Sequence, residues 1–453
     1  MMRSVLTSMV LLVVFMVCGA VDAAERPPNF VIIFADDLGY GDLSCYGAPL
    51  IKTKHLDQMA AEGLRFTSFY CASPICTPSR YGLLTGRYPV RGGFHHVLFP
   101  FSKTGIDAEE VTLAEALQDA GYATGCFGKW HLGHLPDYLP TEHGFDYYYG
   151  VPYSNDMDVK RSRGRPADPL LPLMRNTEII EQPADQSTLT KRYTEEAVAF
   201  IEQHQAEPFF VYVPHSMPHI PIFASQDFTG HSEQGLYGDV IEEIDWSVGQ
   251  ILDTLRDLDL ADNTVVLFSS DNGPWLQFFD HGGSAGPLYG GKGTAFEGGM
   301  RVPGIVWWPE TIAAGREDSS VVATVDMLPT FLKLAGVDLP DRTLDGHDVS
   351  GVLLNTGQQR ADQEYHYFHL DELKGFRSGK WKIKIPFKDT LYLGDPQYLN
   401  GEKKEHGWLL FELEADPGER HDLSAEYPDI LAELQAAREA FLAGMGELPE
   451  RKS

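Results

Sequence analysis

Short runs of apolar, β-branched and aromatic residues alternate along the chain with segments whose apolar residues recur at helical spacing. Four such runs lie at Phe30–Phe34, Tyr122–Phe127, Phe209–Val213 and Thr264–Phe268. Strands that alternate with helices are typical of a mostly parallel or mixed sheet covered by helices. We therefore predict an α/β fold with one large sheet.

The segments between these runs predict helices and one loop. A helix is expected over Thr112–Ala120, because Thr112 and Glu115 form a capping box. A second helix carries an apolar stripe of core residues at Ile241, Ile244, Val248, Ile251, Leu252 and Leu255. The polar segment Met157–Gln182 is rich in Pro and Arg, which predicts an extended surface loop.

The pattern changes after a cluster of Gly, Gln, Arg and Asp at Asn355–Asp362. Strand-like runs follow at Tyr365–His369, Trp381–Ile385 and Trp408–Glu412, and an amphipathic helix is expected over Ile430–Leu442. This pattern favours a small antiparallel sheet with a closing helix. We predict a large domain over residues 25–358, which holds the candidate chemistry, and a smaller α+β domain over residues 359–453.

The first 24 residues have the composition of a cleaved signal peptide. Arg3 precedes the apolar run Leu11–Val17, and small residues follow to Ala24. The protein is therefore expected to be secreted or periplasmic, and no other stretch approaches the length of a membrane span. The formal net charge of −29 over 453 residues argues against nucleic acid or an anionic membrane as a partner. An anionic substrate would need a local positive pocket.

Four cysteines remain after the leader, too few for a disulfide-framed scaffold in a chain of this length. If Cys76 is modified, one bridge can still join two of Cys45, Cys71 and Cys126. The sequence does not choose the pair.

Cys76 opens the string Cys-Thr-Pro-Ser-Arg, which ends at Arg80. Pro78 and Ser79 favour a helix start, so Cys76 would lie at the positive end of a helix with Arg80 one turn further on the same face. Such a position favours an anionic or modified cysteine. The alternative is a small buried thiol beside a structural arginine. A tyrosine-phosphatase loop does not fit, because it needs five residues between Cys and Arg.

Carboxylates follow two of the predicted strands. Asp36 and Asp37 repel each other unless a cation or a shared proton relieves them, so they predict a metal site or, taken alone, a solvated turn. Asp271 and Asn272 would supply further oxygen ligands, because the carboxyl ends of parallel strands meet at one edge of the sheet. An all-oxygen set suits Ca²⁺, or secondarily Mg²⁺, rather than Zn²⁺.

Lysines and histidines accompany these carboxylates. Lys129 and Lys292 each lie among glycines, which lets an anion approach a fixed positive charge, although each could be an exposed loop lysine. His215 and His219 lie in a proline-stiffened turn, where a lone histidine is more often a packed or surface residue.

Taken together, the Cys76–Arg80 string with the following Leu-Thr-Gly, the two lysine segments and the histidine turn resemble the formylglycine-dependent sulfatases of the alkaline phosphatase superfamily. Gly150–Asp156 resembles the arylsulfatase A branch, although His-Asp commonly follows the matching serine there and this chain has Asn-Asp. The resemblance implies that a formylglycine-generating enzyme oxidises Cys76 to formylglycine. It implies a divalent cation held by Asp36, Asp37, Cys76, Asp271 and Asn272. The implied catalytic residues are Cys76, Arg80, Lys129, His131, His219 and Lys292, and the implied substrate-binding residues are Lys129, Ser154, His219 and Lys292.

In the implied reaction a hydroxyl of hydrated formylglycine attacks the sulfur of a sulfate ester. His219 with Lys292 protonates the departing oxygen, and His131 removes the proton of the second hydroxyl so that sulfate is expelled. Sulfated carbohydrate is the expected substrate class. Expected substrate contacts are His95, His96, Phe99, Phe101, Lys160, Arg161, Arg163 and Arg165. For the last four residues, solvated loop charges are an equally good interpretation. The alternatives are a phosphate or phosphonate ester hydrolase and a secreted glycan-binding protein without catalysis.

Overall fold

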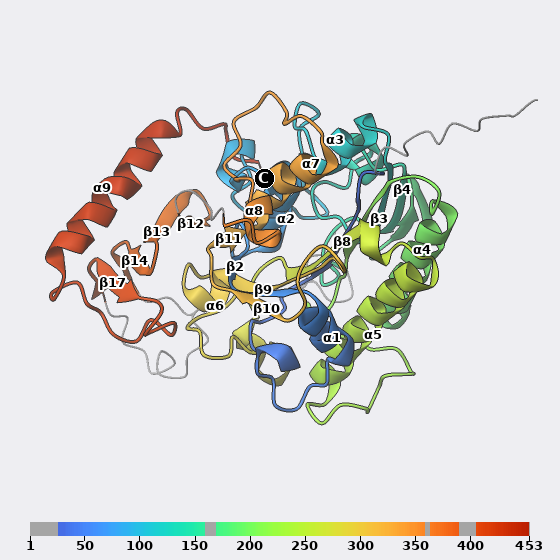
Figure 1. Ribbon diagram of the computed structural model, residues 1–453, viewed down its shortest axis with the longest axis horizontal. Coiled ribbons are helices and arrows are strands. Elements are labelled where there is room, and N and C mark those ends of the chain that lie inside the picture. The colour runs from blue at the N-terminus through green and yellow to red at the C-terminus, as the bar shows by residue number, and fades with distance from the viewer. Residues whose placement is uncertain (1–25, 159–168, 358–362, 389–404, 453) are drawn as a thin grey trace, which may run out of the picture.

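A computed structural model describes residues 26–158, 169–357, 363–388 and 405–452. Its centre is an 11-stranded mixed sheet in the order β10-β2-β9-β8-β1-β7-β3-β4-β5-β6, with β11 beside β2 (Figure 1). The strands are β1 (Asn29–Ala35), β2 (Leu64–Tyr70), β3 (Ala123–Lys129), β4 (Tyr147–Val151), β5 (Leu173–Arg175), β6 (Glu178–Glu181), β7 (Phe209–Pro214), β8 (Thr264–Ser270), β9 (Arg301–Trp307), β10 (Arg316–Asp318) and β11 (Val322–Ala323). Strands β8, β1, β7, β3 and β4 run parallel, as the sequence predicts.

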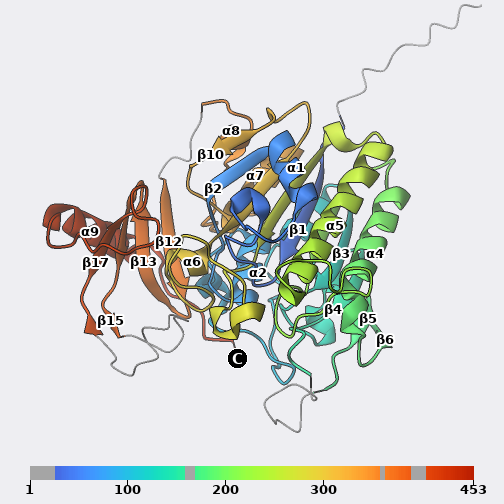
Figure 2. The ribbon, with the colours of Figure 1, turned by 90° about the horizontal axis from the view of Figure 1, so that it is seen from below.

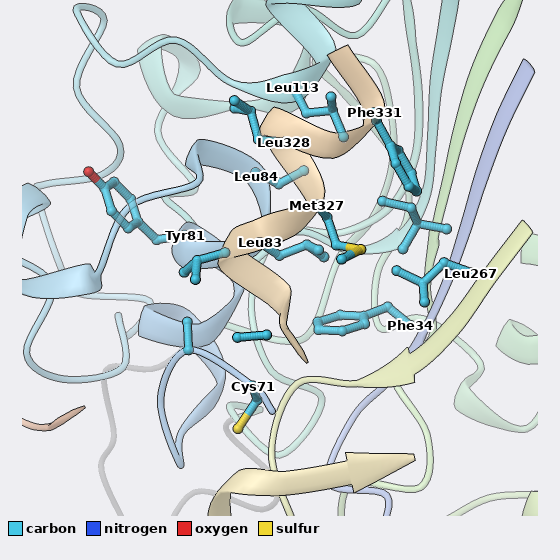
Figure 3. Close-up of a cluster of buried hydrophobic side chains, with 14 of the residues drawn as sticks. Phe34, Cys71, Tyr81, Leu83, Leu84, Leu113, Leu267, Met327, Leu328 and Phe331 are labelled. Carbon is cyan, nitrogen blue, oxygen red and sulfur yellow. The ribbon is translucent and has the colours of Figure 1, made fainter. Parts of the chain in front are cut away.

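Helices cover both faces of this sheet. Along β1 the side chains of Phe30, Ile32 and Phe34 enter one core, and those of the intervening residues enter the other. The first core contains side chains of α2 (Cys76–Thr85), α3 (Leu113–Asp119) and α7 (Met327–Ala335), as Figure 3 shows. The second contains side chains of α1 (Lys54–Glu62), α4 (Leu189–Gln203) and α5 (Leu236–Asp257). Two short helices, α6 (Glu297–Met300) and α8 (Ser350–Leu353), complete this part.

Most predicted elements are confirmed, including the capping box at the start of α3, where the Thr112 side chain accepts from Glu115 N. The prediction of a loop throughout Met157–Gln182 is wrong. Part of this segment forms the edge strands β5 and β6, because Leu173 and Met174 are buried and β5 pairs with β4. Strands of three or four residues are too short to show a clear alternation in the sequence.

A separate antiparallel sheet, here called the C-terminal sheet, has the order β12-β13-β14-β17 and lies beside the large sheet (Figure 2). Its strands are β12 (Glu364–His369), β13 (Glu372–Ser378), β14 (Trp381–Lys384) and β17 (Leu409–Glu412), and α9 (Pro428–Gly444) packs against β13 and β14. A two-stranded ribbon joins β15 (Phe387–Lys388) to β16 (Glu405–His406). The predicted domain boundary at residue 358 and the predicted leader over residues 1–24 lie outside the described residues and stay predictions.

Two further predictions concern bridges and membrane spans. Cys45, Cys71, Cys76 and Cys126 are all free, so the described residues contain no disulfide. Among the described residues, no helix combines the length and the apolar character that crossing a membrane requires.

Candidate active site

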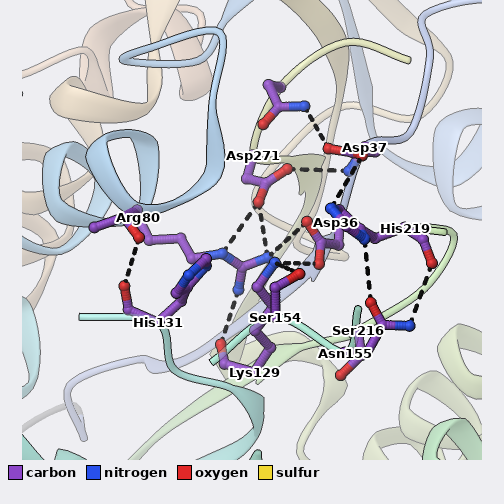
Figure 4. Close-up of polar contacts among 12 residues, drawn as sticks. Asp36, Asp37, Arg80, Lys129, His131, Ser154, Asn155, Ser216, His219 and Asp271 are labelled. Carbon is purple, nitrogen blue, oxygen red and sulfur yellow. Dashed lines mark hydrogen bonds and ion pairs between the residues drawn. The ribbon is translucent and has the colours of Figure 1, made fainter. Parts of the chain in front are cut away.

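The residues that the sequence singles out meet at the carboxyl edge of the parallel strands (Figure 4). Asp36 and Asp37 follow β1, Asp271 and Asn272 follow β8, and Cys76 is the first residue of α2. All five are buried. The topology therefore brings together segments that are more than 200 residues apart in the chain, as the hydrogen bond from Asp37 N to Asp271 Oδ1 shows (3.1 Å).

The acidic residues form a compact group of oxygen atoms. Asp36, Asp37 and Asp271 each offer a carboxylate oxygen within 4.8 Å of the others. Asn272 Nδ2 donates to Asp37 Oδ1 at 2.7 Å, which fixes the amide beside them. Asp36 Oδ1 and Asn272 Oδ1 are buried and accept no hydrogen bond from any described residue, although Arg80 Nη2 lies 3.5 Å from Asp36 Oδ1. Unsatisfied buried oxygen atoms among clustered carboxylates fit a hard cation with oxygen ligands.

The electrostatics of this group also fit a cation. Burial and the neighbouring Asp36 raise the pKa of Asp271 against the attraction of Arg80. Burial acts in the same direction on Asp36, but Lys129, His219 and Arg80 outweigh it and lower the pKa of that carboxyl. The Asp36 and Asp271 carboxylates therefore repel each other and compete for the same cationic side chains. A bound cation would relieve this repulsion.

Three cationic side chains contact the carboxylates. Arg80 Nη2 donates to Asp271 Oδ2 at 2.8 Å, and Nη1 donates to the carbonyl oxygen of Lys129 at 2.8 Å. Lys129 Nζ donates to Asp36 Oδ2 at 2.6 Å, and Lys292 Nζ donates to Asp37 Oδ2 at 2.7 Å. The three cations formally balance the three carboxylates, so a divalent cation would leave the site positive. With such a cation, the site would form the local positive pocket that an anionic substrate needs in such an acidic chain.

Cys76 lies within this charged group. Its side chain is 2% exposed, and its sulfur, an Asp36 oxygen and a His219 nitrogen lie within 4.8 Å of one another. Burial raises the pKa of the thiol to about 11, against the attraction of Lys129 and Lys292. The start of α2 is confirmed at Cys76, but burial favours a protonated thiol over the anionic form that the helix end alone would favour.

His219 is held by a residue that the sequence analysis did not assign to the site. Its Nδ1 faces two acceptors, Asn155 Oδ1 at 3.1 Å and the carbonyl oxygen of Ile220 at 2.6 Å, so Nδ1 carries a proton. Its Nε2 then points to the site, 3.6 Å from Asp37 Oδ2. Asn155 Nδ2 donates to Gln186 Oε1 and to the carbonyl oxygen of Pro221, which orients the amide oxygen towards His219. The only signal in the sequence was the position of Asn155 directly after Ser154.

Ser154 and His131 complete the group. Lys129 Nζ donates to Ser154 Oγ at 3.2 Å, so the serine lies beside a sulfate-binding candidate. His131 Nε2 contacts the carbonyl oxygen of Leu98 at 2.9 Å, while its buried Nδ1 has no hydrogen-bond partner among the described residues. Burial and Lys129 lower the pKa of His131 well below its usual value, which keeps the imidazole neutral.

The contact with Leu98 places the segment 95–101 next to the site. His95 is buried, His96 is exposed, and the rings of Phe99 and Phe101 stack with centroids 5.1 Å apart. The other expected substrate contacts, Lys160, Arg161, Arg163 and Arg165, lie outside the described residues. His215 is fully buried and contacts Ser247 at 3.3 Å, and it is not part of the carboxylate group.

The chain matches the family profile described as Sulfatase over residues 28–337, and the profile described as N-sulphoglucosamine sulphohydrolase, C-terminal, over residues 289–441. Arylsulfatase A of Bos taurus is 42% identical over 93% of this chain and 88% of its own length. N-acetylgalactosamine-6-sulfatase of Canis lupus familiaris is 41% identical over 90% of this chain and 84% of its own. The crystal structure of PsFucS1 sulfatase from Pseudoalteromonas sp. superposes with a TM-score of 0.84 at 29% identity, covering 94% of this chain and 92% of that one.

Proposed function

The chain belongs to the sulfatase family and is a sulfatase, and from this premise we propose that it hydrolyses sulfate esters of carbohydrates by means of formylglycine at position 76 and one divalent cation. The observation that carries the proposal is the meeting of Cys76 with three carboxylates and three cationic side chains at one buried edge of the sheet. A sulfated carbohydrate is supported by the relative named N-acetylgalactosamine-6-sulfatase.

Asp36, Asp37, Asp271 and Asn272 would hold the cation together with the modified residue 76. Ca²⁺ is proposed rather than Mg²⁺, because the protein supplies several oxygen ligands. Ca²⁺ accepts many such ligands in flexible geometry, whereas Mg²⁺ usually keeps several water ligands. The cation would supply positive charge against the sulfuryl oxygens, and formylglycine in its hydrated form would supply the attacking hydroxyl.

The remaining residues bind the sulfate group and move protons. Lys129, Ser154 and Lys292 face the group around Cys76 and would bind the sulfuryl oxygens, where charge must be stabilised in the transition state. Arg80 holds Asp271 and the Lys129 carbonyl in place and would orient residue 76. These contacts support binding of an anion at this edge in spite of the large negative charge of the chain.

His219 and His131 are suited to the two proton transfers. His219 Nε2 points towards the carboxylates, and in the imidazolium form, with a proton on Nε2 as well as on Nδ1, it would with Lys292 protonate the departing alcohol oxygen. His131 is neutral and has its buried Nδ1 free of partners among the described residues, so it can accept the proton of the second hydroxyl. Proton donation and proton acceptance therefore fall to different histidines.

Maturation and location follow from the same proposal. A formylglycine-generating enzyme must oxidise Cys76 before the chain folds around it, because the residue is 2% exposed in the folded protein. The predicted leader over residues 1–24 would direct the chain to a secretory or periplasmic compartment.

Paired rate measurements on 4-nitrophenyl sulfate and 4-nitrophenyl phosphate test the proposal. We expect a higher kcat/KM for the sulfate, and no hydrolysis of either ester by the Cys76→Ala variant. A preference for the phosphate would support the phosphate ester hydrolase, and binding of sulfated glycan without turnover by the fully modified enzyme would support the glycan-binding protein.

A further inference from the structure

A second cluster of buried charges lies where the C-terminal sheet meets the large sheet. Glu297 begins α6, which lies between α2 and the C-terminal sheet (Figure 2). Its Oε1 accepts from Lys382 Nζ of β14 at 3.0 Å and from the Tyr367 hydroxyl of β12 at 2.6 Å. Its Oε2 accepts from the Tyr70 hydroxyl of β2 at 2.7 Å. One carboxylate therefore joins the two sheets.

Lys382 is the central cation of this cluster. Its Nζ lies 2.8 Å from Glu419 Oε1, and Glu419 Oε2 accepts from the backbone N of Glu297 at 2.6 Å. Glu297 and Lys382 are fully buried, and Glu419 is 7% exposed. Burial acts to raise the pKa of Glu297, but Lys382, Arg301 and Arg377 lower it to about 2, so its carboxylate is ionised. Arg301 Nη1 lies 3.5 Å from Glu297 Oε2, so removing Lys382 takes away one of the two cations that pair with this buried carboxylate.

The same segment that ends in this cluster carries Lys292. Residues 290–299 contact the chain on both sides of the active site, after Asn272 and before Cys76. Lys292 N donates to the carbonyl oxygen of Pro274 at 2.8 Å, and Gly293 N donates to that of Pro74 at 2.9 Å. Gly273 N, directly after the candidate metal ligand Asn272, donates to the carbonyl oxygen of Gly299 at 3.1 Å. The segment thus lies against the residues before Cys76 and those after Asn272.

Little space is left for this segment to shift. A Cβ atom on Gly273 would lie 1.8 Å from the Gly298 carbonyl oxygen, and one on Gly298 would lie 2.2 Å from that of Gly290. Backbones packed this closely transmit a displacement at one end of the segment to the other. The position of Glu297 therefore constrains the position of Lys292, five residues earlier in the chain.

We propose that Lys382 is a positioning residue for sulfate ester hydrolysis: through Glu297 it fixes the segment that carries Lys292, so that the C-terminal sheet forms part of the catalytic apparatus. This inference rests on the role proposed above for Lys292. Under this inference, the C-terminal sheet contributes to turnover through Lys382, whether or not the sheet contacts the substrate.

A double-mutant cycle between Lys382→Met and Lys292→Ala separates positioning from a general loss of stability. The readout is kcat and KM on 4-nitrophenyl sulfate, normalised to the folded fraction. If Lys382 acts through Lys292, we expect Lys382→Met to lower kcat/KM by about 10- to 100-fold in the wild-type background. In the Lys292→Ala background the same change should cost less than about 3-fold, because the positioned group is already absent.

Two further variants complete the experiment. Lys380→Met removes an exposed lysine next to the start of β14, and its kcat/KM should equal that of the wild type. Tyr367→Phe removes only the hydroxyl that donates to Glu297 and serves in the same cycle if Lys382→Met does not fold.

The positioning role would be overturned if Lys382→Met lowered kcat/KM by the same factor in the wild-type and Lys292→Ala backgrounds. A folded Lys382→Met variant with unchanged kinetics would also overturn it. In both results the wild type still hydrolyses the sulfate, so the proposed function stands. A wild-type enzyme with formylglycine that does not hydrolyse the ester would overturn both proposals.

Discussion

Asn155 offers a specific test of how His219 is prepared to act as a proton donor. The structure places the Asn155 amide oxygen 3.1 Å from His219 Nδ1, and two donated hydrogen bonds hold the amide in this orientation. Asn155→Ala removes this acceptor but leaves the Ile220 carbonyl oxygen at 2.6 Å, so the imidazole loses one of its two anchors. We therefore expect a partial loss of proton donation.

The size of the effect follows from the contact that is lost. One buried hydrogen bond contributes about 0.5–1.5 kcal/mol, which corresponds to about 2- to 13-fold in rate if it acts only in the transition state. Complete removal of the imidazole in His219→Ala should cost more, about 10²- to 10⁴-fold, the usual range for a general acid. The Asn155 effect should therefore be a fraction of the His219 effect, with the same dependence on substrate.

The informative assay compares aryl sulfates whose phenols have different pKa values. A good leaving group departs without a proton, whereas a poor one depends on the donor. Asn155→Ala should therefore slow esters of weakly acidic phenols by the full factor and leave 4-nitrophenyl sulfate almost unchanged. Asn29→Ala, which removes a buried amide from the opposite end of β1, serves as the matched control and should show no such trend. An equal loss for every leaving group would refute this account of His219.

Three other predictions concern the cation, the sulfate contacts and the response to pH. Chelation of divalent cations should abolish hydrolysis and lower the Tm, with Ca²⁺ restoring both; full activity in excess chelator would contradict the metal site. Lys129→Met should lower kcat/KM by about 10²-fold or more, because it removes a positive charge from the sulfate site. Ser154→Ala removes only a neutral contact of that lysine and should lower kcat/KM by about 10-fold or less. Equal losses for the two variants in steady-state kinetics would argue against this order. Burial lowers the pKa of His215 from its usual 6.5 to about 3. Between these two pH values the unfolded chain binds a proton at this histidine and the folded chain does not. The free energy of unfolding should therefore fall as the pH drops from 6.5 towards 3. Urea unfolding of His215→Gln should show a weaker loss over this interval, and an unchanged pH dependence would show that other groups cause it.

The sequence was sufficient to predict that the candidate metal ligands lie together at one edge of the sheet. Apolar runs mark the buried parallel strands, and the carboxyl ends of such strands necessarily share one edge. The placement of Asp36 and Asp271 together follows from this rule alone. The helix that begins at Cys76 is likewise encoded locally, by Pro78 and Ser79.

Other features depend on contacts that no local pattern encodes. Asn155 orients His219 only because the chain returns through Gln186 and Pro221, and an asparagine after a serine gives no sign of this. The short strands β5 and β6 form because β5 pairs with β4 and β6 pairs with β5, which overrides the polar composition of the longer segment that contains them. The ion pair between Glu297 and Lys382 joins a residue of α6 to a residue of the C-terminal sheet, so neither sequence neighbourhood indicates it.

The most direct test of the central claim is the mass of the tryptic peptide that spans residues 66–80, taken from catalytically active protein. The peptide contains both Cys71 and Cys76, so fragmentation must assign the change to one of them. We expect an aldehyde in place of the thiol at residue 76 and an intact thiol at residue 71. An intact thiol at residue 76 in enzyme that hydrolyses sulfate esters would rule out formylglycine as the nucleophile.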